Sequence, residues 1–324
     1  MRNSNKKFYS VIVIFILLLT ILTITALVCG KVNLFTLKNE VIRDTILIKI
    51  RLPRVILAIS AGCILAVSGA VLQSLLNNPL ADSYTLGISS GAALGACLTI
   101  YINIVFEKNI PIQFNAIVFS LLVLILVIKI AGLKGRLTIT NLVLAGIIVS
   151  SICQAGVSFF KSIADEDAVS MINWLMGNLG SKTIFQVLMV TVTALVGTII
   201  CFKYSKELNI MTMGRREALL VGVNYDFINK LFLIICALMT AMCVSLCGII
   251  GFVGLVVPHL TRLLIGADNQ RVIPVSAILG SLLLLGADTL TRVVLNHELP
   301  VGVLTTLVGG PFFCYIFIKR KEVI

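Results

Sequence analysis

The sequence predicts an all-α integral membrane protein with about ten transmembrane helices, and three observations support this fold class. Hydrophobic residues make up 59% of the 324 residues and charged residues only 12%, whereas soluble domains average about 45–50% apolar and about 25% charged residues. The mean hydropathy is +1.09. The apolar residues gather in runs close to the roughly 20 residues that cross a bilayer, and lipid cannot satisfy an open strand edge, so these runs are predicted to be helices.

Ten apolar runs follow one another and define a single transmembrane domain over residues 1–324. They lie near residues 11–29, 54–76, 84–103, 114–131, 141–161, 184–203, 231–249, 251–266, 272–293 and 301–318. The eighth run is short, so a broken or re-entrant piece is the alternative to a full span. The first run is long for a signal peptide and no small-residue cleavage site follows it cleanly, so we expect an uncleaved span.

The distribution of Lys and Arg predicts the orientation of these spans. Basic residues concentrate at both chain ends and in alternate links, which favours cytoplasmic termini by the positive-inside rule. The net charge of +12 is therefore interpreted as loop charge and not as a nucleic-acid-binding surface. Lys49, Arg51 and Arg54 are an exception, because they precede the second run on the predicted outer side.

A polar stretch, QSLLNNPLADSYTLGISSGAALG at Gln73–Gly95, interrupts the apolar runs. Pro79 cannot donate a backbone hydrogen bond and disfavours helical geometry at Asn78, which predicts a tight inner turn after the second span. The following Gly and Ser residues allow helices to pack closely. Gln73, Asn77 and Asn78 are costly in lipid, so we expect them to face protein or a water-filled path.

Three further polar features occur near the ends of predicted spans. The longest inner link, about residues 206–229, contains Ala218 and Gly222, which suit a short helix that a partner approaches closely; a solvated basic loop is the alternative. His259 and Arg262 share a helix face and are expected to form structural hydrogen bonds. Asp288 and Arg292 have the i, i+4 spacing of a helix-stabilising ion pair.

A faint internal echo suggests that spans 2–5 and 7–10 form an inverted repeat. Gly69, Pro79 and Gly87 recur 179 positions later as Gly248, Pro258 and Gly266. Five spans separate the two copies, so they would cross the bilayer in opposite directions, as inverted transporter repeats do.

The sequence offers little material for catalysis or metal binding. The nine cysteines are scattered through apolar runs without a CxxC pair, and His259 and His297 are the two histidines, so we expect no metal site and no catalytic residue. No GxxxxGK[ST] phosphate-binding loop is present, so ATP hydrolysis is not expected in this chain. We therefore expect no bound cofactor and no enzyme activity.

Three long stretches together resemble the FecCD/BtuC family of ABC importer permeases. They are RLPRVILAISAGCILAVSGAVLQSLLNNPLADSYTLGISSGAALGA from Arg51, GFVGLVVPHLTRLLIGADNQR and LGADTLTRVVLNHELPVGVLTTLVGGPFF. The resemblance covers about residues 10–320. It implies a BtuC-like fold with ten spans, a second permease subunit (homodimer or related heterodimer), two cytoplasmic ATPase subunits that use ATP and Mg, and an extracytoplasmic binding protein.

The resemblance also implies a cargo, a location and site residues. The cargo is expected to be an iron–siderophore, with haem or cobalamin as alternatives, and the location a bacterial cytoplasmic membrane. Arg51, Arg54 and Arg292 match arginines that dock the binding protein; anchors that snorkel at the membrane edge are the alternative. The cytoplasmic gate matches Asn77, Asn78, Leu80, Thr138, Ile139 and Thr140. The ATPase contacts match Glu217, Ala218 and Gly222 in the coupling loop 206–229.

The predicted mechanism is alternating access driven by the partner ATPase. An ion-coupled secondary transporter is the alternative from another class, but such a protein normally carries ionisable residues deep in its spans. Apart from Asp288 and Arg292, ionisable groups here lie near span ends and turns. A membrane-embedded enzyme is less consistent with the sequence because it lacks clustered catalytic groups.

Overall fold

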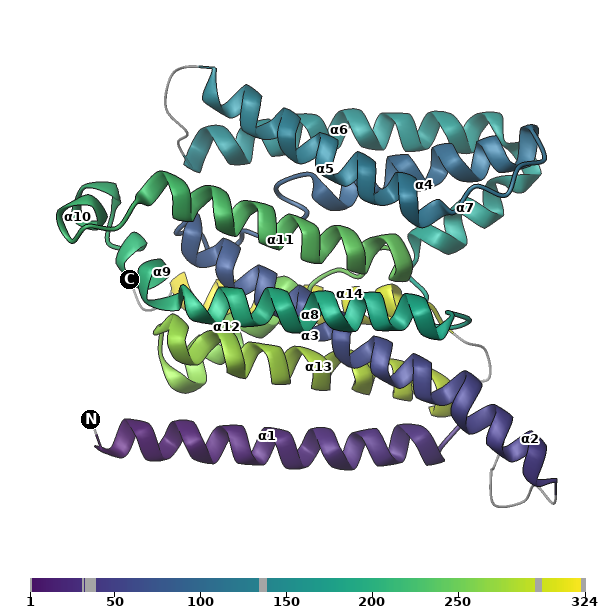
Figure 1. The fold of residues 1–324 in the computed structure, drawn as a ribbon, viewed down its shortest axis with the longest axis horizontal. Coiled ribbons are helices and arrows are strands. Elements are labelled where there is room, and N and C mark those ends of the chain that lie inside the picture. The colour runs from purple at the N-terminus through teal and green to yellow at the C-terminus, as the bar shows by residue number, and fades with distance from the viewer. Residues whose placement is uncertain (1, 31, 33–38, 134–138, 295–298, 322–324) are drawn as a thin grey trace.

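Helices form throughout the chain because lipid leaves each backbone N–H and C=O to be satisfied within its own segment. The computed structural model describes all residues except 1, 31, 33–38, 134–138, 295–298 and 322–324, and the long helices in it lie side by side (Figure 1). In this part of the chain every regular element is helical: α1 (Arg2–Val28), α2 (Glu40–Asp44), η1 (Thr45–Arg51), α3 (Leu52–Leu75), α4 (Ile88–Val105), α5 (Ile112–Gly132), α6 (Ile139–Ile163), η2 (Asp165–Asp167), α7 (Ala168–Leu175), α8 (Ile184–Lys203), α9 (Ser205–Met211), α10 (Arg215–Leu220), α11 (Tyr225–Cys247), α12 (Val253–Ile265), α13 (Asn269–Val294) and α14 (Val301–Lys321).

The two ends of the bundle differ in what they contain. Both chain termini and α10 lie at the left of Figure 1, and we call this the α10 end. Helices α2 and α7 lie at the opposite side, which we call the α7 end. The chain is thus a multi-pass bundle whose connecting segments gather at two opposite faces.

The ten predicted runs correspond to ten helices, eight of which are long and apolar enough to cross a membrane. The other two apolar helices in the described residues are shorter, Val253–Ile265 and Val301–Cys314. The predicted eighth run is α12, whose 13 residues extend about 20 Å at about 1.5 Å per residue. This is less than the roughly 30 Å hydrocarbon thickness, so α12 fits the re-entrant alternative.

Helix α3 is the centre of the bundle and packs against α8, α11, α12 and α13. Two close backbone approaches make this possible. A Cβ atom added at Gly62 would lie 2.3 Å from the carbonyl oxygen of Gly280, and one added at Gly69 would lie 2.1 Å from that of Gly254. Small residues at helix crossings are the usual way to pack helices where lipid provides no hydrophobic driving force.

The first helices of the two proposed repeats run in opposite directions, as the inverted-repeat hypothesis requires. Helix α3 runs towards the α10 end, whereas α11 runs towards the α7 end (Figure 1). The predicted equivalence of residues 179 positions apart is wrong, however. Gly69 lies inside α3, whereas Gly248 caps the end of α11, so the spacing of 179 does not join equivalent positions.

Candidate functional site

The polar stretch after α3 turns back into the bundle. Helix α3 ends at Leu75, and Asn77 then adopts a positive φ of 43°. Further on, a Cβ atom added at Gly146, about two turns into α6, would lie 2.1 Å from the carbonyl oxygen of Thr85. The segment 76–87 therefore returns from the α10 end to the depth at which α4 begins, and the predicted span 84–103 starts later, at Ile88.

Side chains within this re-entrant segment satisfy its non-helical backbone. Asp82 Oδ1 accepts hydrogen bonds from the backbone N–H groups of Tyr84 and Thr85, both at 3.0 Å. The Thr85 hydroxyl donates to the Asp82 carbonyl oxygen at 2.7 Å. The Ser83 hydroxyl lies 2.7 Å from that of Thr240 in α11. Irregular backbone inside a membrane protein needs such partners, which explains why the sequence is polar here.

A second re-entrant segment, residues 248–252, precedes α12. Gly248 and Phe252 have positive φ values of 72° and 66°. A left-handed conformation is unfavourable for a bulky residue such as phenylalanine. Phe252 begins α12 as its N-cap residue, and a Cβ atom added at Gly309 would lie 2.5 Å from Phe252 Cβ. The glycine in α14 therefore leaves room for the Phe252 side chain.

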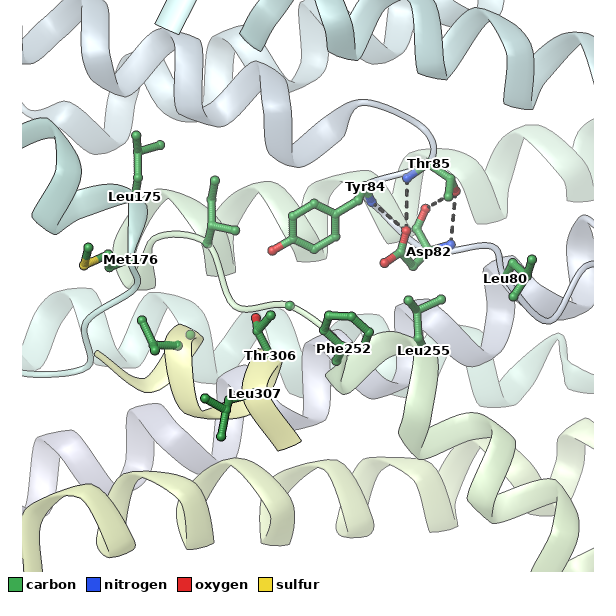
Figure 2. A pocket seen from close by; sticks show the side chains of 14 residues that line it. Leu80, Asp82, Tyr84, Thr85, Leu175, Met176, Phe252, Leu255, Thr306 and Leu307 are labelled. Carbon is green, nitrogen blue, oxygen red and sulfur yellow. Dashed lines mark hydrogen bonds between the residues drawn. The ribbon is translucent and has the colours of Figure 1, made fainter. Parts of the chain in front are cut away.

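The two re-entrant segments, the end of α7 and α14 line an open cavity of about 730 Å³. Leu80 lies at one extreme of the lining and Leu175 with Met176 at the other, while Phe252 lies between them (Figure 2). The lining is mostly apolar, and its polar members are Asp82, Tyr84, Thr85 and Thr306. Ligand-binding pockets commonly have volumes of roughly 300–1,000 Å³ and this mixture of apolar walls and few polar groups.

Asp82 and Tyr84 are the titratable side chains among the residues that line this cavity. Within the described residues, no group of three or more His, Cys, Asp or Glu side chains could hold a metal ion. Asp82 is engaged by its own turn, and no nucleophile–base pair accompanies it among the lining residues.

The predicted gate residues differ in their positions. Leu80 is 41% exposed and lines the cavity. Asn78 Oδ1 accepts from the Leu80 backbone N–H at 2.9 Å, and Asn77 Nδ2 donates to the Thr212 carbonyl oxygen at 3.0 Å. The two asparagines therefore shape the turn that presents Leu80. Thr140 is exposed near the start of α6; Thr138 and the side chain of Ile139 lie outside the described residues.

The predicted docking arginines lie at the α7 end, where Arg51 and Arg292 are buried and Arg54 is partly buried. Arg54 and Arg292 both contact Asp288, with N–O distances of 2.9 Å. This confirms the predicted Asp288–Arg292 pair and adds Arg54 to it. Arg51 is 5% exposed and donates to the carbonyl oxygens of Leu27, Val28 and Val32.

The guanidinium groups of all three arginines therefore make contacts within the chain, and their docking role stays a prediction. Arg51 hydrogen-bonds the last carbonyl groups of α1, a position where helix ends favour cations. Arg292 is 7% exposed and also donates to the Ala26 carbonyl oxygen at 3.4 Å. The arginines at this end, Arg51, Arg54 and Arg292, thus help to hold α1 and α3 against α13.

The predicted coupling loop contains α9 and α10. A short helix at Ala218 is confirmed, since α10 spans Arg215–Leu220 and Gly222 follows with a positive φ of 86°. Glu217 and Gly222 are exposed. Ala218 is fully buried within this chain, and its predicted role in the ATPase contact stays a prediction. Successive residues of a helix point in directions about 100° apart, so Ala218 can be buried while Glu217 and Leu219 are exposed.

Sequence reasoning missed several residues around the cavity. Phe252, Tyr84 and Met176 line it, but each belongs to a motif interpreted as a span or an outer turn. The sequence feature that could have located them was the short eighth run, because a stretch too short to cross the bilayer implies non-helical backbone beside it. The polar partners of that backbone then mark the site.

The chain is similar to permeases of ABC importers over most of its length. The FecCD transport family model matches residues 10–319. The hemin transport system permease HmuU of Yersinia pestis is 37% identical over 317 residues, which cover 95% of both chains. The cobalamin import permease BtuC of Halobacterium salinarum is 38% identical over 272 residues, 84% of this chain and 73% of the relative.

A solved structure agrees with these sequence relationships. It shows an inward-facing conformation of a transporter assigned to the metal-chelate type of ABC transporter, with a TM-score of 0.85 and 30% identity over 96% of this chain and 99% of the other. ABC permeases of this family are transport subunits, and ATP hydrolysis takes place in separate subunits. With a helical bundle, two re-entrant segments and a family match over nearly its whole length, this chain belongs to the FecCD transport family and is the permease subunit of an ABC importer.

Proposed function

We propose that this permease carries an iron–siderophore complex across a bacterial cytoplasmic membrane, with energy from ATP hydrolysed in two partner ATPase subunits. The observation that carries the proposal is the cavity of about 730 Å³ between the two re-entrant segments. Its mainly apolar wall suits a chelate that shields its metal within an organic shell. The haemin permease relative supports an iron complex as cargo, and haem or cobalamin remain the alternatives within the family.

The distribution of charge supports a cytoplasmic α10 end. Basic residues near this end in the described chain include Lys7, Lys203, Lys206, Arg215, Arg216 and Lys230. By the positive-inside rule, this end faces the cytoplasm together with both termini. The cavity would then open past Leu80 to the cytoplasm and past Met176 to the outside.

The tip formed by α10 and the following turn is the proposed ATPase contact. Leu219, Leu220 and Val221 are 53%, 79% and 69% exposed, at a position beyond the membrane-spanning helices. An exposed apolar patch with polar neighbours is typical of a protein interaction site. Glu217 and Gly222 flank this patch, so we propose that they contribute to the contact. The exposed leucines are less consistent with the alternative of a solvated basic loop.

The α7 end is the proposed site for the binding protein. The group of Arg51, Arg54, Arg292 and Asp288 has a formal net charge of +2, since it contains three cations and one carboxylate, which Arg54 and Arg292 contact. We propose that this charge attracts acidic residues of the binding protein. Charges of this kind guide docking and fix orientation more than they add affinity.

The proposed transport cycle is alternating access. Closure of the ATPase subunits on ATP would move the α10 tip and change the turn formed by Asn77, Asn78 and Leu80, together with residues 138–140. A second permease subunit, either the same chain or a related one, would complete the wall of the path. Each state must differ in its contacts with cargo or partners, because a ligand shifts an equilibrium only through differential affinity.

Uptake measurements in cells test the energy source and the cargo. Cells that carry the permease, its ATPase and its binding protein receive ferric siderophores, haemin or cobalamin labelled with a radioisotope. We expect uptake of a ferric siderophore that stops on ATP depletion and continues when a protonophore collapses the proton gradient. Uptake that survives ATP depletion and stops with the protonophore would instead indicate a secondary transporter. Selective uptake of haemin or cobalamin would identify the alternative cargo.

A further inference from the structure

A continuous chain of hydrogen bonds crosses the α10 end between α9 and the cavity wall. Its members are Gln73 and Ser74 in α3, Asn209 in α9, Arg262 in α12, and Asp268 and Asn269 at the start of α13. We call these six residues the polar relay. Gln73, Ser74 and Asn269 are buried, so water has little access to replace their contacts.

The first part of the polar relay joins α9 to the turn between α12 and α13. Asn209 Nδ2 donates to Asp268 Oδ1 at 2.7 Å. Asn209 Oδ1 accepts from the backbone N–H of Asn269 at 2.8 Å. A single amide side chain therefore uses both its donor and its acceptor to hold this turn.

The second part joins α13 to α3 and α12. The Ser74 hydroxyl donates to Asn269 Oδ1 at 2.8 Å and accepts from an Arg262 guanidinium nitrogen at 3.1 Å. Arg262 also donates to the Ala70 carbonyl oxygen at 3.0 Å and to Gln73 Oε1. This confirms the structural hydrogen bonding expected of Arg262 and fixes the orientation of the Gln73 amide.

The last part reaches the cavity wall through a gap in the α12 hydrogen bonding. Pro258 has no N–H, so the carbonyl oxygen of Gly254, four residues earlier, lacks its intrahelical donor. Gln73 Nε2 donates to this oxygen at 3.1 Å and to that of Leu255 at 3.2 Å. Leu255 lines the cavity beside Phe252 (Figure 2). The proline thus creates the acceptor at which the polar relay ends.

We propose that the polar relay makes α12 and the cavity wall move with α9 when the ATPase acts on the neighbouring α10 tip. The six residues are positioning residues, because they act through Leu255 and Phe252 and not on the cargo. This inference depends on the proposed transport function. Spatial continuity is not coupling by itself, so the test must separate coupling from simple anchoring of the helices.

The exchange of Asn209 and Asp268 provides that test. Asn209→Asp removes the donor and places a second carboxylate beside Asp268, while it keeps the acceptor for the Asn269 N–H. The double variant Asn209→Asp/Asp268→Asn restores a donor and an acceptor in reversed order. The matched control is Asn115→Asp, because Asn115 Nδ2 donates to the Thr99 hydroxyl at 2.8 Å between α5 and α4, away from the polar relay.

The measurement is cargo taken up per ATP hydrolysed by the complete complex in proteoliposomes, with the thermal stability of each variant measured alongside. We expect Asn209→Asp to hydrolyse ATP but to transport about tenfold less cargo per ATP, in the range of typical coupling energies. The double variant should transport an amount of cargo per ATP within about twofold of the wild type, and Asn115→Asp should keep the wild-type ratio of cargo to ATP.

Three results would overturn the inference. One is a wild-type ratio in Asn209→Asp, with or without a loss of stability, which would show that the polar relay only anchors helices. Another is a double variant that assembles normally but does not regain the wild-type ratio of cargo to ATP. The third is absence of ATP-dependent uptake by the wild-type complex. This result would refute the proposed function itself, and it is recognised because the wild type and every variant then lack such uptake.

Discussion

Partly or fully buried arginines occur at both ends of this bundle, but their guanidinium groups contact different kinds of acceptor. At the α7 end, Arg54 and Arg292 share the carboxylate of Asp288. At the α10 end, the acceptors that Arg262 contacts in the described residues are neutral oxygens of Gln73, Ser74 and Ala70. An ion pair adds attraction between opposite charges, which a neutral acceptor does not provide.

This difference indicates which end is fixed and which end can rearrange. Separating Asp288 from its arginines would leave opposite charges uncompensated inside the protein, which is costly. Exchanging one neutral acceptor of Arg262 for another costs less free energy than separating Asp288 from its arginines. The α7 end is therefore held firmly, whereas the α10 end, where the ATPase is proposed to act, is held by contacts that can be exchanged.

The largest expected effect comes from removing the carboxylate at the α7 end. Asp288→Ala leaves Arg54 and Arg292 without this anion, so we expect a loss of about 3–5 kcal/mol of stability. The thermal unfolding midpoint of the detergent-solubilised permease measures it. Asp44→Ala is the control, because Asp44 is 59% exposed and lies 3.7 Å from Arg43, and surface pairs contribute only about 0–1 kcal/mol. Equal midpoints for the two variants would show that Asp288 does not fasten this end.

The next largest effect concerns the close approach of α3 and α12. Gly69→Ala places a methyl group about 2 Å from a backbone oxygen of α12, so α12 must shift, at a cost of about 1–3 kcal/mol typical of overpacking. We expect reduced stability and reduced ATP-dependent uptake. Gly286→Ala in α13 is the control, since its nearest neighbour would be Leu22 Cδ2 at 3.6 Å. A Gly69→Ala permease as active and stable as the control would contradict this packing.

A smaller effect is expected at the α10 tip, where stability should not change. Leu220→Asp places a charge on a side chain that is 79% exposed, and we expect ATPase affinity to fall about tenfold, by about 1.4 kcal/mol. Binding of purified ATPase to permease in nanodiscs measures it. Leu133→Asp is the control, because Leu133 is 81% exposed after α5 but lies outside the coupling loop. An unchanged affinity in Leu220→Asp would remove the tip from the interface.

The smallest effect is expected for docking of the binding protein. Arg54→Gln lowers the positive charge at the α7 end, and we expect association to slow about two- to fivefold at low salt, with the difference fading at high salt. Stopped-flow association rates measure this effect. Lys108→Gln, an exposed cation at the same end, provides the comparison. If both variants associate at the wild-type rate, the arginine cluster has a structural role alone.

Composition and periodicity were sufficient to predict the helical bundle. Apolar runs of nearly bilayer length have few other stable structures in lipid, so the long helices were recovered with boundaries that shifted by a few residues. The beginning of α11 moved from residue 231 to Tyr225, because polar residues of the inner link continue the helix. The i, i+4 pair of Asp288 and Arg292 was also predictable, since it depends on a single helix.

Contacts between distant segments could not be predicted in the same way. The sequence shows that Gln73 is polar and that Pro258 lacks an N–H, but it does not show that one supplies the hydrogen bond missing from the other. Arg51 presented the same difficulty: its position before the second span left a docking group and a membrane-edge anchor open, and did not show that it donates to carbonyl oxygens at the end of α1. In both cases the contact depends on how distant segments of the chain pack together.

The measurement that most directly tests the account is transport by the purified complex in proteoliposomes, with an active ATPase or with an ATPase variant that binds ATP without hydrolysing it. The account predicts that labelled cargo accumulates against its gradient only with the active ATPase and the binding protein. Accumulation by the permease alone, or with the inactive ATPase, would contradict the claim that this chain is a pathway opened by its partners.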